Sequence, residues 1–312
     1  MNPLTLIWTR LPDDSGGLPG VRELLDAVSA ADGIDALSEQ FVLGLGDARL
    51  AHQHLIGEDA AGRLVAVAAI ADDEVEFAVH PEQRRLGYGA QMLQALADRV
   101  DGLKIWAHGN LDGAQAIAGA ENLEVVRRLL VLEISGDSLD AAAGVDLPVG
   151  VSALDLGDSV ERWGEDQVLD AWLTANNEAF AWHPEQGGWD RDRLRRGMDV
   201  EWFNPADVWL LWDSSAGTDA DAAMPGLAGF HWTKWHDATT AEVYVVGLAD
   251  AYRGRGLGAP TVSMGLRHLR EGGARRVILY VEDDNVAAVE RYRADGFTVA
   301  EEHVVYSADP AR

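Results

Sequence analysis

The sequence predicts a mixed α/β fold that occurs twice along the chain. Residues 77–96 (FAVHPEQRRLGYGAQMLQAL) and 246–266 (VGLADAYRGRGLGAPTVSMGL) share one pattern: an apolar strand, a polar connection, arginine, alternating glycines and an amphipathic helix. Aligning Gly87 with Gly256 also aligns Gly89 with Gly258. The 312 residues are enough for two domains of about 150 residues each. We therefore expect two copies of one domain in tandem.

Each half is expected to present its elements in the same order. Apolar and β-branched runs at 50–80 and 207–248 predict strands, and the glycine turn with its helix follows them. A further strand is expected in GLKIWAH and in RRVILYV, each followed by a helix. A last strand, VVRRLLVLEI or EEHVVYSA, closes each half, so each half should form a mixed sheet with helices.

The least regular segment between the halves is 135–150 (SGDSLDAAAGVDLPVG), which is small, acidic and contains glycine. Such a composition suits a linker. We expect an N-terminal domain at 1–140 and a C-terminal domain at 151–312. A second stretch of this kind, 213–226, predicts a solvent loop between two strands.

Composition excludes several classes of function. The 52 acidic and 25 basic residues give a net charge of -27, which repels nucleic acids and anionic lipids. No apolar run approaches a membrane span, and the start lacks a signal-peptide pattern, so we expect a cytoplasmic protein. The absence of cysteine excludes disulfides, thiolate zinc sites and a cysteine nucleophile.

The glycine turns do not match the common nucleotide motifs. A Walker loop needs Lys and then Ser or Thr after its last glycine, whereas Ala259 or Ala90 follows here. A dinucleotide fingerprint needs G-x-G-x-x-G, and the third glycine is missing. What remains is R-x-x-G-x-G between strand and helix, where bare main-chain amides can close on a pyrophosphate. A tight turn without ligand would explain one copy, but the duplication favours a ligand.

The two turns resemble the coenzyme signature Q/R-x-x-G-x-G/A of the GNAT family of acetyl-CoA-dependent N-acetyltransferases. The matching stretches are 253–258 and 84–89. The second half also resembles the family's N-x-x-A-x-x-x-Y-x-x-x-G-F segment, with Asn285, Tyr292 and Phe297 in place. The resemblance implies two tandem GNAT domains, acetyl-CoA as acetyl donor and no metal.

Tyr292 and Glu242 are the expected catalytic residues. Helical spacing from a predicted N-cap at Asn285 points the Tyr292 hydroxyl toward the sheet edge, where a phenol can donate to a departing thiolate. Glu242 lies on the strand before the turn, should share a face with Tyr244 and Val246, and can take the amine proton. The alternatives are that Tyr292 packs on Phe297 and that Glu242 is a solvated strand-end carboxylate. Gly247 and Leu248 are expected to offer amides to the thioester oxygen.

The first half lacks the tyrosine, because Ala118 stands at its position and Asn122-Leu123 replaces Gly-Phe. We expect this half to be non-catalytic. In the second half, tryptophan and polar residues in 176–190 and 229–238 suit a sugar or polyol acceptor. His231 and His236 should face opposite ways, which makes them a poor metal pair.

Within the GNAT family, the chain resembles tandem members from actinobacteria that acetylate the cysteinyl amine of cysteinyl-glucosaminyl-inositol, the last step of mycothiol biosynthesis. By position, this resemblance implies acceptor contacts from Glu39, Glu185, Lys234, Glu242 and Tyr280. It implies coenzyme contacts from Val246, Gly247, Leu248, Arg253, Gly254, Arg255, Gly256, Leu257, Gly258, Ala259 and Asn285. A second coenzyme molecule would lie at Ala78, Val79, His80, Leu86, Gly87, Tyr88, Gly89, Ala90 and Gln91.

Two other functions stay open at this point. A tandem N-acetyltransferase acting on another small amine, such as an aminoglycoside or an amino acid, would keep the glycine turn and Tyr292. A non-catalytic sensor would bind coenzyme A without turnover. In every case we expect a monomer with a small-molecule ligand.

Overall fold

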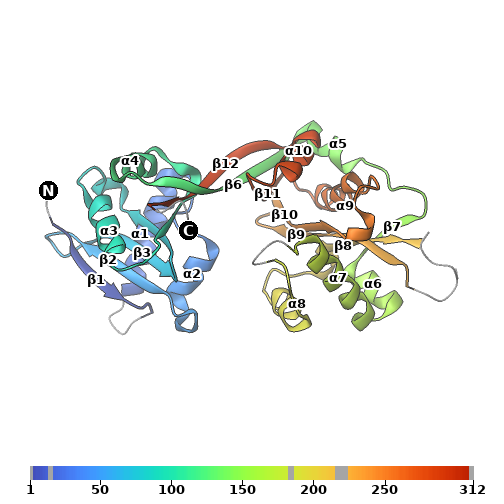
Figure 1. Ribbon diagram of the computed structural model, residues 1–312, viewed down its shortest axis with the longest axis horizontal. Helices are drawn as coiled ribbons and strands as arrows, with labels where there is room; N and C mark the ends of the chain where they lie inside the picture. Colours follow the sequence, from blue (N-terminus) through green and yellow to red (C-terminus); the bar gives the residue numbers. More distant parts are fainter. Residues whose placement is uncertain (1–2, 13–16, 182–185, 215–223, 309–312) are drawn as a thin grey trace. The chain divides into compact units, whose positions relative to one another are not determined.

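A computed structural model describes residues 3–12, 17–181, 186–214 and 224–308 (Figure 1). The chain forms two compact units. Unit 1 comprises Met1–Leu130, Glu282–Asp284 and Glu301–Arg312, and unit 2 comprises Val131–Val281 and Asn285–Ala300. The two units repeat one mixed α/β plan, which confirms the predicted fold class.

Unit 1 has a mixed sheet in the order β1-β2-β3-β4-β5-β12. The strands β1 to β4 pair antiparallel, β5 runs parallel to β4, and the end of β12 pairs antiparallel with β5. The elements are β1 (Thr5–Thr9), α1 (Gly17–Asp32), α2 (Glu39–Gly46), β2 (Gln53–Glu58), β3 (Leu64–Ala71), β4 (Glu74–Val79), α3 (Tyr88–Ala97), β5 (Lys104–Ala107) and α4 (Asp112–Glu121).

Strand β3 explains why helices cover both faces of this sheet. Its run LVAVAAIA is apolar at every position, as expected for a strand that is buried on both sides. Val67 and Ala69 pack with residues of α1 and α2, whereas Ala66 and Ala68 pack with residues of α3. The cores on the two faces hold α3 and its preceding turn at a fixed place beside β4.

Unit 2 repeats the pattern with the strand order β6-β11-β10-β9-β8-β7. Strands β7 to β10 pair antiparallel and β11 runs parallel to β10. The elements that lie in unit 2 in whole or in part are β6 (Glu124–Ser135), α5 (Gly136–Ala143), β7 (Val151–Asp155), α6 (Leu156–Trp163), α7 (Glu165–Ala179), α8 (Arg191–Met198), β8 (Val208–Asp213), β9 (Gly226–Trp235), β10 (Thr240–Leu248), α9 (Gly258–Glu271), β11 (Arg276–Glu282), α10 (Val286–Ala294) and β12 (Thr298–Ser307).

The core of unit 2 is rich in tryptophan. Trp172 of α7 packs edge to face on Phe230 and Trp232 of β9, and Trp212 of β8 is fully buried. On the opposite face, a Cβ on Gly265 of α9 would overlap the His231 ring, so glycine lets this helix approach the sheet. Trp232, one of the tryptophans in the two stretches that suggested a sugar site, is therefore a core residue.

The predicted linker at 135–150 was wrong in part. Residues Gly136–Ala143 form helix α5, whose Leu139 is buried. Arg267 of α9 donates to the carbonyls of Ala143 and Val145, at 3.0 and 2.8 Å. This stretch is thus packed into unit 2. The loop expected at 213–226 joins β8 to β9, and its residues 215–223 lie outside the described part of the chain.

Candidate active site

Strands β10 and β11 of unit 2 are paired at one end only, and we call this arrangement a fork. Their parallel pairing covers Thr240–Glu242 of β10 and ends at the pair Glu242 and Ile278. Directly after this point β10 carries a bulge, because Val243 pairs with Thr233 and Val245 with Trp232, which leaves Tyr244 as the extra residue. The rest of β10 can therefore offer its backbone to an extended ligand.

The bulge corrects the predicted side-chain pattern of β10. Glu242 lies opposite Lys234, whereas Val246 lies opposite His231, which is buried beneath α9. Glu242 and Val246 therefore face opposite sides of the sheet, and the prediction that they share a face was wrong. Strict alternation fails here because the extra residue reverses the order of faces.

The glycine turn after β10 is open toward solvent. Gly254 and Gly256 have φ of 73° and 78°, which are left-handed values that favour glycine. A Cβ at Gly254, Gly256 or Gly258 would meet nothing within 4 Å, so a ligand can approach the main chain here. Helix α9 begins at Gly258, and its free N–H groups favour an anion. These features fit the diphosphate of a coenzyme A thioester.

Arginines support this turn. Arg253 donates to the carbonyls of Glu178 and Ala179 at the end of α7, at 3.0 and 3.2 Å. The guanidinium of Arg255 lies 5.2 Å from the ring centre of Tyr252. Both arginines are exposed, so their charges are accessible from solvent.

Glu242 is buried at the closed end of the fork, with 7% of its surface exposed. The Nε2 atom of His236 lies 2.8 Å from its Oε2 atom. The Nζ atom of Lys234, which is opposite Glu242, lies 4.8 Å from the ring centre of Trp202 and 5.7 Å from that of Tyr244. The structure thus places a buried carboxylate beside aromatic and cationic groups, which excludes the alternative of a solvated strand-end residue.

Tyr292 lies on α10, and the predicted N-cap of this helix is present. The Oδ1 atom of Asn285 accepts a hydrogen bond from the N–H of Ala288 at 3.3 Å. The Tyr292 ring packs edge to face on Phe297 with centroids 5.6 Å apart. Burial raises the pKa of Tyr292 to about 12, and Asp295 raises it in the same direction. The phenol therefore keeps its hydrogen at neutral pH, as a donor must.

The other predicted acceptor residues are spread over the chain. Tyr280 of β11 is 47% exposed. Glu39 is the exposed first residue of α2 in unit 1. Glu185 lies outside the described residues. Sequence reasoning missed the contact of His236 with Glu242, although a hairpin between two predicted strands was a signal that these residues approach each other.

Comparison with known proteins also indicates an acetyltransferase. The acetyltransferase (GNAT) family model matches residues 169–297. A mycothiol acetyltransferase of Corynebacterium aurimucosum is 49% identical over 293 residues, covering 92% of this chain and 93% of that protein. A mycothiol acetyltransferase of Corynebacterium diphtheriae is 44% identical over 310 residues, covering 97% and 98%. The chain belongs to the mycothiol acetyltransferase family. It is an N-acetyltransferase with GNAT domains, as the sequence predicted.

Solved structures agree on the fold. A GCN5-related N-acetyltransferase from Sphaerobacter thermophilus is similar with a TM-score of 0.67 at 18% identity, covering 99% of this chain and 97% of that one. A tandem GNAT protein from the clavulanic acid biosynthesis pathway has a TM-score of 0.67 at 17% identity, covering 99% of both chains. At such identities the likeness concerns the fold, and it confirms the tandem GNAT arrangement.

Among the residues that the structure describes, no helix has an apolar run long enough to span a bilayer. Within the same residues, no three His, Asp or Glu side chains are grouped as metal ligands.

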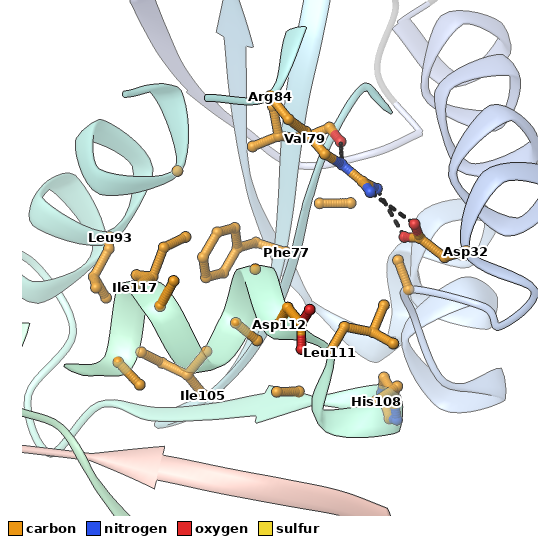
Figure 2. A pocket seen from close by; sticks show the side chains of 18 of the residues that line it. Asp32, Phe77, Val79, Arg84, Leu93, Ile105, His108, Leu111, Asp112 and Ile117 are labelled. Atoms are coloured by element: carbon orange, nitrogen blue, oxygen red, sulfur yellow. Dashed lines mark hydrogen bonds and ion pairs between the residues drawn. The ribbon is translucent and has the colours of Figure 1, made fainter. Parts of the chain in front are cut away.

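Unit 1 carries a cleft of about 890 Å³ at the corresponding fork (Figure 2). The parallel pairing of β4 and β5 ends at Glu76 and Trp106. Arg85 and Gly87 have φ of 65° and 85°, so the first turn repeats the backbone of the second even though arginine replaces one glycine. The predicted coenzyme residues that line the cleft are Ala78, Val79, Gly87, Tyr88, Gly89 and Ala90.

The remaining predicted residues of this half lie outside the cleft lining. Leu86 is 47% exposed, and His80 accepts a hydrogen bond from the N–H of Glu82. Gln91 accepts one from the N–H of Leu4 at 2.8 Å. Figure 2 shows Arg84 reaching across the cleft to Asp32, with two hydrogen bonds of 2.7 Å.

The structure aligns Ala118 of α4 with Tyr292 of α10. The carbonyl of Ala118 accepts from the N–H of Leu123 at 2.9 Å, as that of Tyr292 does from Phe297 at 3.0 Å. The residue before the donor is left-handed in both helices, with φ of 55° at Asn122 and 99° at Gly296. Ala118 lines the cleft, so a methyl group stands where unit 2 has a phenol.

Glu76 at the closed end of this fork was not predicted. Its Oε2 atom accepts from the N–H of Ser38 at 2.6 Å, and its Oε1 atom lies 3.0 Å from Nε2 of His108. His108 in turn has its Nδ1 atom 3.1 Å from Nδ1 of His303. Both oxygens of Glu76 are therefore engaged, which distinguishes it from an open base.

Proposed function

We propose that the chain transfers the acetyl group of acetyl-CoA to the cysteinyl amine of cysteinyl-glucosaminyl-inositol, which completes mycothiol. The family to which the chain belongs supports this acceptor. The observation that carries the chemistry is the fork of β10 and β11, which closes on a buried Glu242, together with the open glycine turn that follows β10.

The turn 253–259 and the start of α9 would hold the diphosphate, with Asn285 at the start of α10. Val246, Gly247 and Leu248 would offer main-chain groups to the pantetheine arm and to the thioester oxygen. Acetyl-CoA supplies an activated acetyl group on sulfur. The open space above the three glycines and the exposed Arg253 and Arg255 support this placement.

Glu242 takes the proton from the acceptor ammonium, so that the nitrogen can attack the thioester carbon directly. Tyr292 gives its proton to the leaving sulfur, so that coenzyme A departs as a thiol, and the second proton of the attacking nitrogen restores the phenol. No acyl group passes through the enzyme, which agrees with a sequence that has no cysteine. The buried position of Glu242 at the closed end of the fork supports its role.

The acceptor would be held by Glu39, Glu185, Lys234, Glu242 and Tyr280. Lys234 and Glu242 are cross-strand neighbours, which supports a common role. Trp202 and Tyr244, whose rings lie 4.9 Å apart, provide aromatic faces of the kind that pack on sugar rings. This pair is a further candidate for the sugar or inositol part of the acceptor.

The N-terminal domain at 1–140, completed in the fold by the chain's last strand, would bind a second coenzyme molecule without turnover. Ala118 provides no acid, and the two oxygens of Glu76 are already engaged by Ser38 and His108. Two coenzyme molecules per chain, with acetyl transfer falling strongly when Tyr292 or Glu242 is replaced, would support this assignment. Parental transfer in both variants would contradict it.

Mass spectrometry of the product tests the main proposal. Acetyl-CoA and cysteinyl-glucosaminyl-inositol should yield the N-acetylated acceptor and free coenzyme A in equal amounts. A thiol dye would mislead, because the acceptor and the product both carry a sulfhydryl group. Acetylation of another amine in place of this one would indicate a different tandem acetyltransferase. Binding of acetyl-CoA without release of coenzyme A would indicate a sensor.

A further inference from the structure

His236 lies in the hairpin loop between β9 and β10. Its own N–H donates to the carbonyl of Thr240 at 3.0 Å. Asp237 accepts from the N–H groups of Thr239 and Thr240, at 2.7 and 2.9 Å. The loop is thus fixed by main-chain contacts before any ligand binds. It holds the His236 ring with its Nε2 atom 2.8 Å from Oε2 of Glu242.

The burial of the two partners differs. The Glu242 side chain is 9% exposed, whereas the His236 side chain is 35% exposed. A buried carboxylate needs hydrogen-bond donors to remain ionised. His236 supplies one such donor, and its ring also reaches solvent.

The other charged groups on the strands and helices around Glu242 make other contacts. Lys234, opposite Glu242 on β9, directs its Nζ atom over Trp202 and Tyr244. On β11 the neighbour of Glu242 is the apolar Ile278, and Arg276 is engaged by Glu133 at 2.6 Å. Glu178 of α7 accepts from the N–H of Asp250. Of these groups, His236 is the one in hydrogen-bond contact with the Glu242 carboxylate.

The two forks differ at this point. In unit 1 both oxygens of Glu76 are engaged, one by the Ser38 amide and one by His108. In unit 2 the contact recorded among the described residues is made by Oε2 of Glu242, and Oε1 remains available for an incoming proton. A single imidazole can therefore fix the carboxylate without blocking it.

We propose that His236 is a positioning residue for the base Glu242. Its Nε2–H donates to Oε2, which fixes the carboxylate rotamer, stabilises the ionised form and leaves Oε1 for the proton of the acceptor amine. The inference rests on the proposed function, since it assigns a partner to the base of that reaction.

The test compares His236→Ala and His236→Gln with the full-length parent protein. Rates are measured from pH 5 to 10 by mass spectrometry of the acetylated product. Loss of a hydrogen bond to a charged group corresponds to roughly a tenfold to hundredfold effect. We expect His236→Ala to lower kcat by that factor, with KM for acetyl-CoA unchanged. The acid limb of the profile should move to higher pH, because the carboxylate loses a donor that favoured its ionised form.

His236→Gln keeps an N–H donor. It should therefore restore most of the rate and return the acid limb of the pH profile close to its parental position. His268→Ala is the matched control, because His268 also contacts a carboxylate, Asp207, at 2.6 Å, but on α9 away from the fork. It should leave the acid limb where it is. A His236→Ala protein with parental kcat and an unmoved limb would overturn the proposal, as would equal damage in both His236 variants without a shift of the limb.

A second measurement does not depend on the acceptor. The carboxyl carbon of Glu242 can be titrated by NMR in the parent and in His236→Ala, and its pKa should be higher in the variant. If this shift occurs but no acetylated product forms, the proposed function fails and the assignment of His236 as the carboxylate's partner stands. If product forms and the pKa does not change, the assignment of His236 fails by itself.

Discussion

Replacing Tyr292 by phenylalanine isolates the role of one oxygen atom. Phenylalanine keeps the ring and therefore the edge-to-face contact with Phe297, whose centroid lies 5.6 Å away. The N-cap at Asn285 and the coenzyme turn are several residues away and are not altered. We therefore expect a normally folded protein with nearly unchanged affinity for acetyl-CoA.

Turnover should fall strongly in Tyr292→Phe. A positioned acid or donor typically contributes a factor of about 10² to 10⁴, which corresponds to roughly 3 to 5 kcal/mol of activation free energy. Because burial raises the pKa of Tyr292 to about 12, the parental phenol stays protonated through the neutral range, and the loss should be the same at every pH from 6 to 9.

The assay is the rate of formation of acetylated acceptor by mass spectrometry, together with calorimetric titration of acetyl-CoA. Parental turnover in Tyr292→Phe would show that the residue only packs, and the assignment of a donor role would have to be abandoned. A large loss of coenzyme affinity would instead point to a binding role.

Three further predictions address the base, the first turn and the core. Glu242→Gln should lower kcat by about 10² or more and abolish the acid limb of the pH profile; a normal limb would exclude it as the base. Arg85→Gly should raise the free energy of unfolding by about 1 kcal/mol in urea titrations, because Arg85 has a left-handed φ of 65° that glycine adopts without strain. Burial lowers the pKa of His231 to about 4, so the unfolded chain binds its proton below pH 6.5 and the folded chain does not. Stability should therefore fall between pH 6.5 and 4, by up to roughly 3 kcal/mol for this residue, and His231→Asn should show a smaller dependence on pH in the same titrations.

The parts of the fold that could be predicted from the sequence are those determined by residues close together along the chain. The glycine turns were visible because left-handed backbone and close approach of a ligand both favour residues without Cβ, and the G-x-G spacing occurs twice. The N-cap at Asn285 was visible for a similar reason, since its side chain bonds a main-chain group three residues away. The order of strands and helices followed from apolar periodicity.

The features that escaped prediction depend on contacts between distant segments. The bulge at Tyr244 leaves no mark in the uniformly β-forming run of β10, yet it decides which face Val246 occupies. Helix α5 has a weak local pattern and is stabilised by its contacts with α9. Glu76 and His108 meet across a parallel strand pair, which spacing alone does not show. His236 and Glu242 are close in sequence, and the predicted hairpin indicated their approach, but only the register of the hairpin decides that the two side chains meet.

The end of strand β12 belongs to unit 1, and this affects how the protein can fold during its synthesis. Val304–Ser307 of β12 pair with Lys104–Ala107 of β5, so unit 1 receives one of its strands from the end of the chain. The usual order during translation, in which the first domain folds while the second is still being synthesised, cannot be completed here. Until residues 304–307 leave the ribosome, β5 has an unpaired edge, and unpaired edges promote aggregation. Truncations that remove these residues should therefore damage the N-terminal unit first.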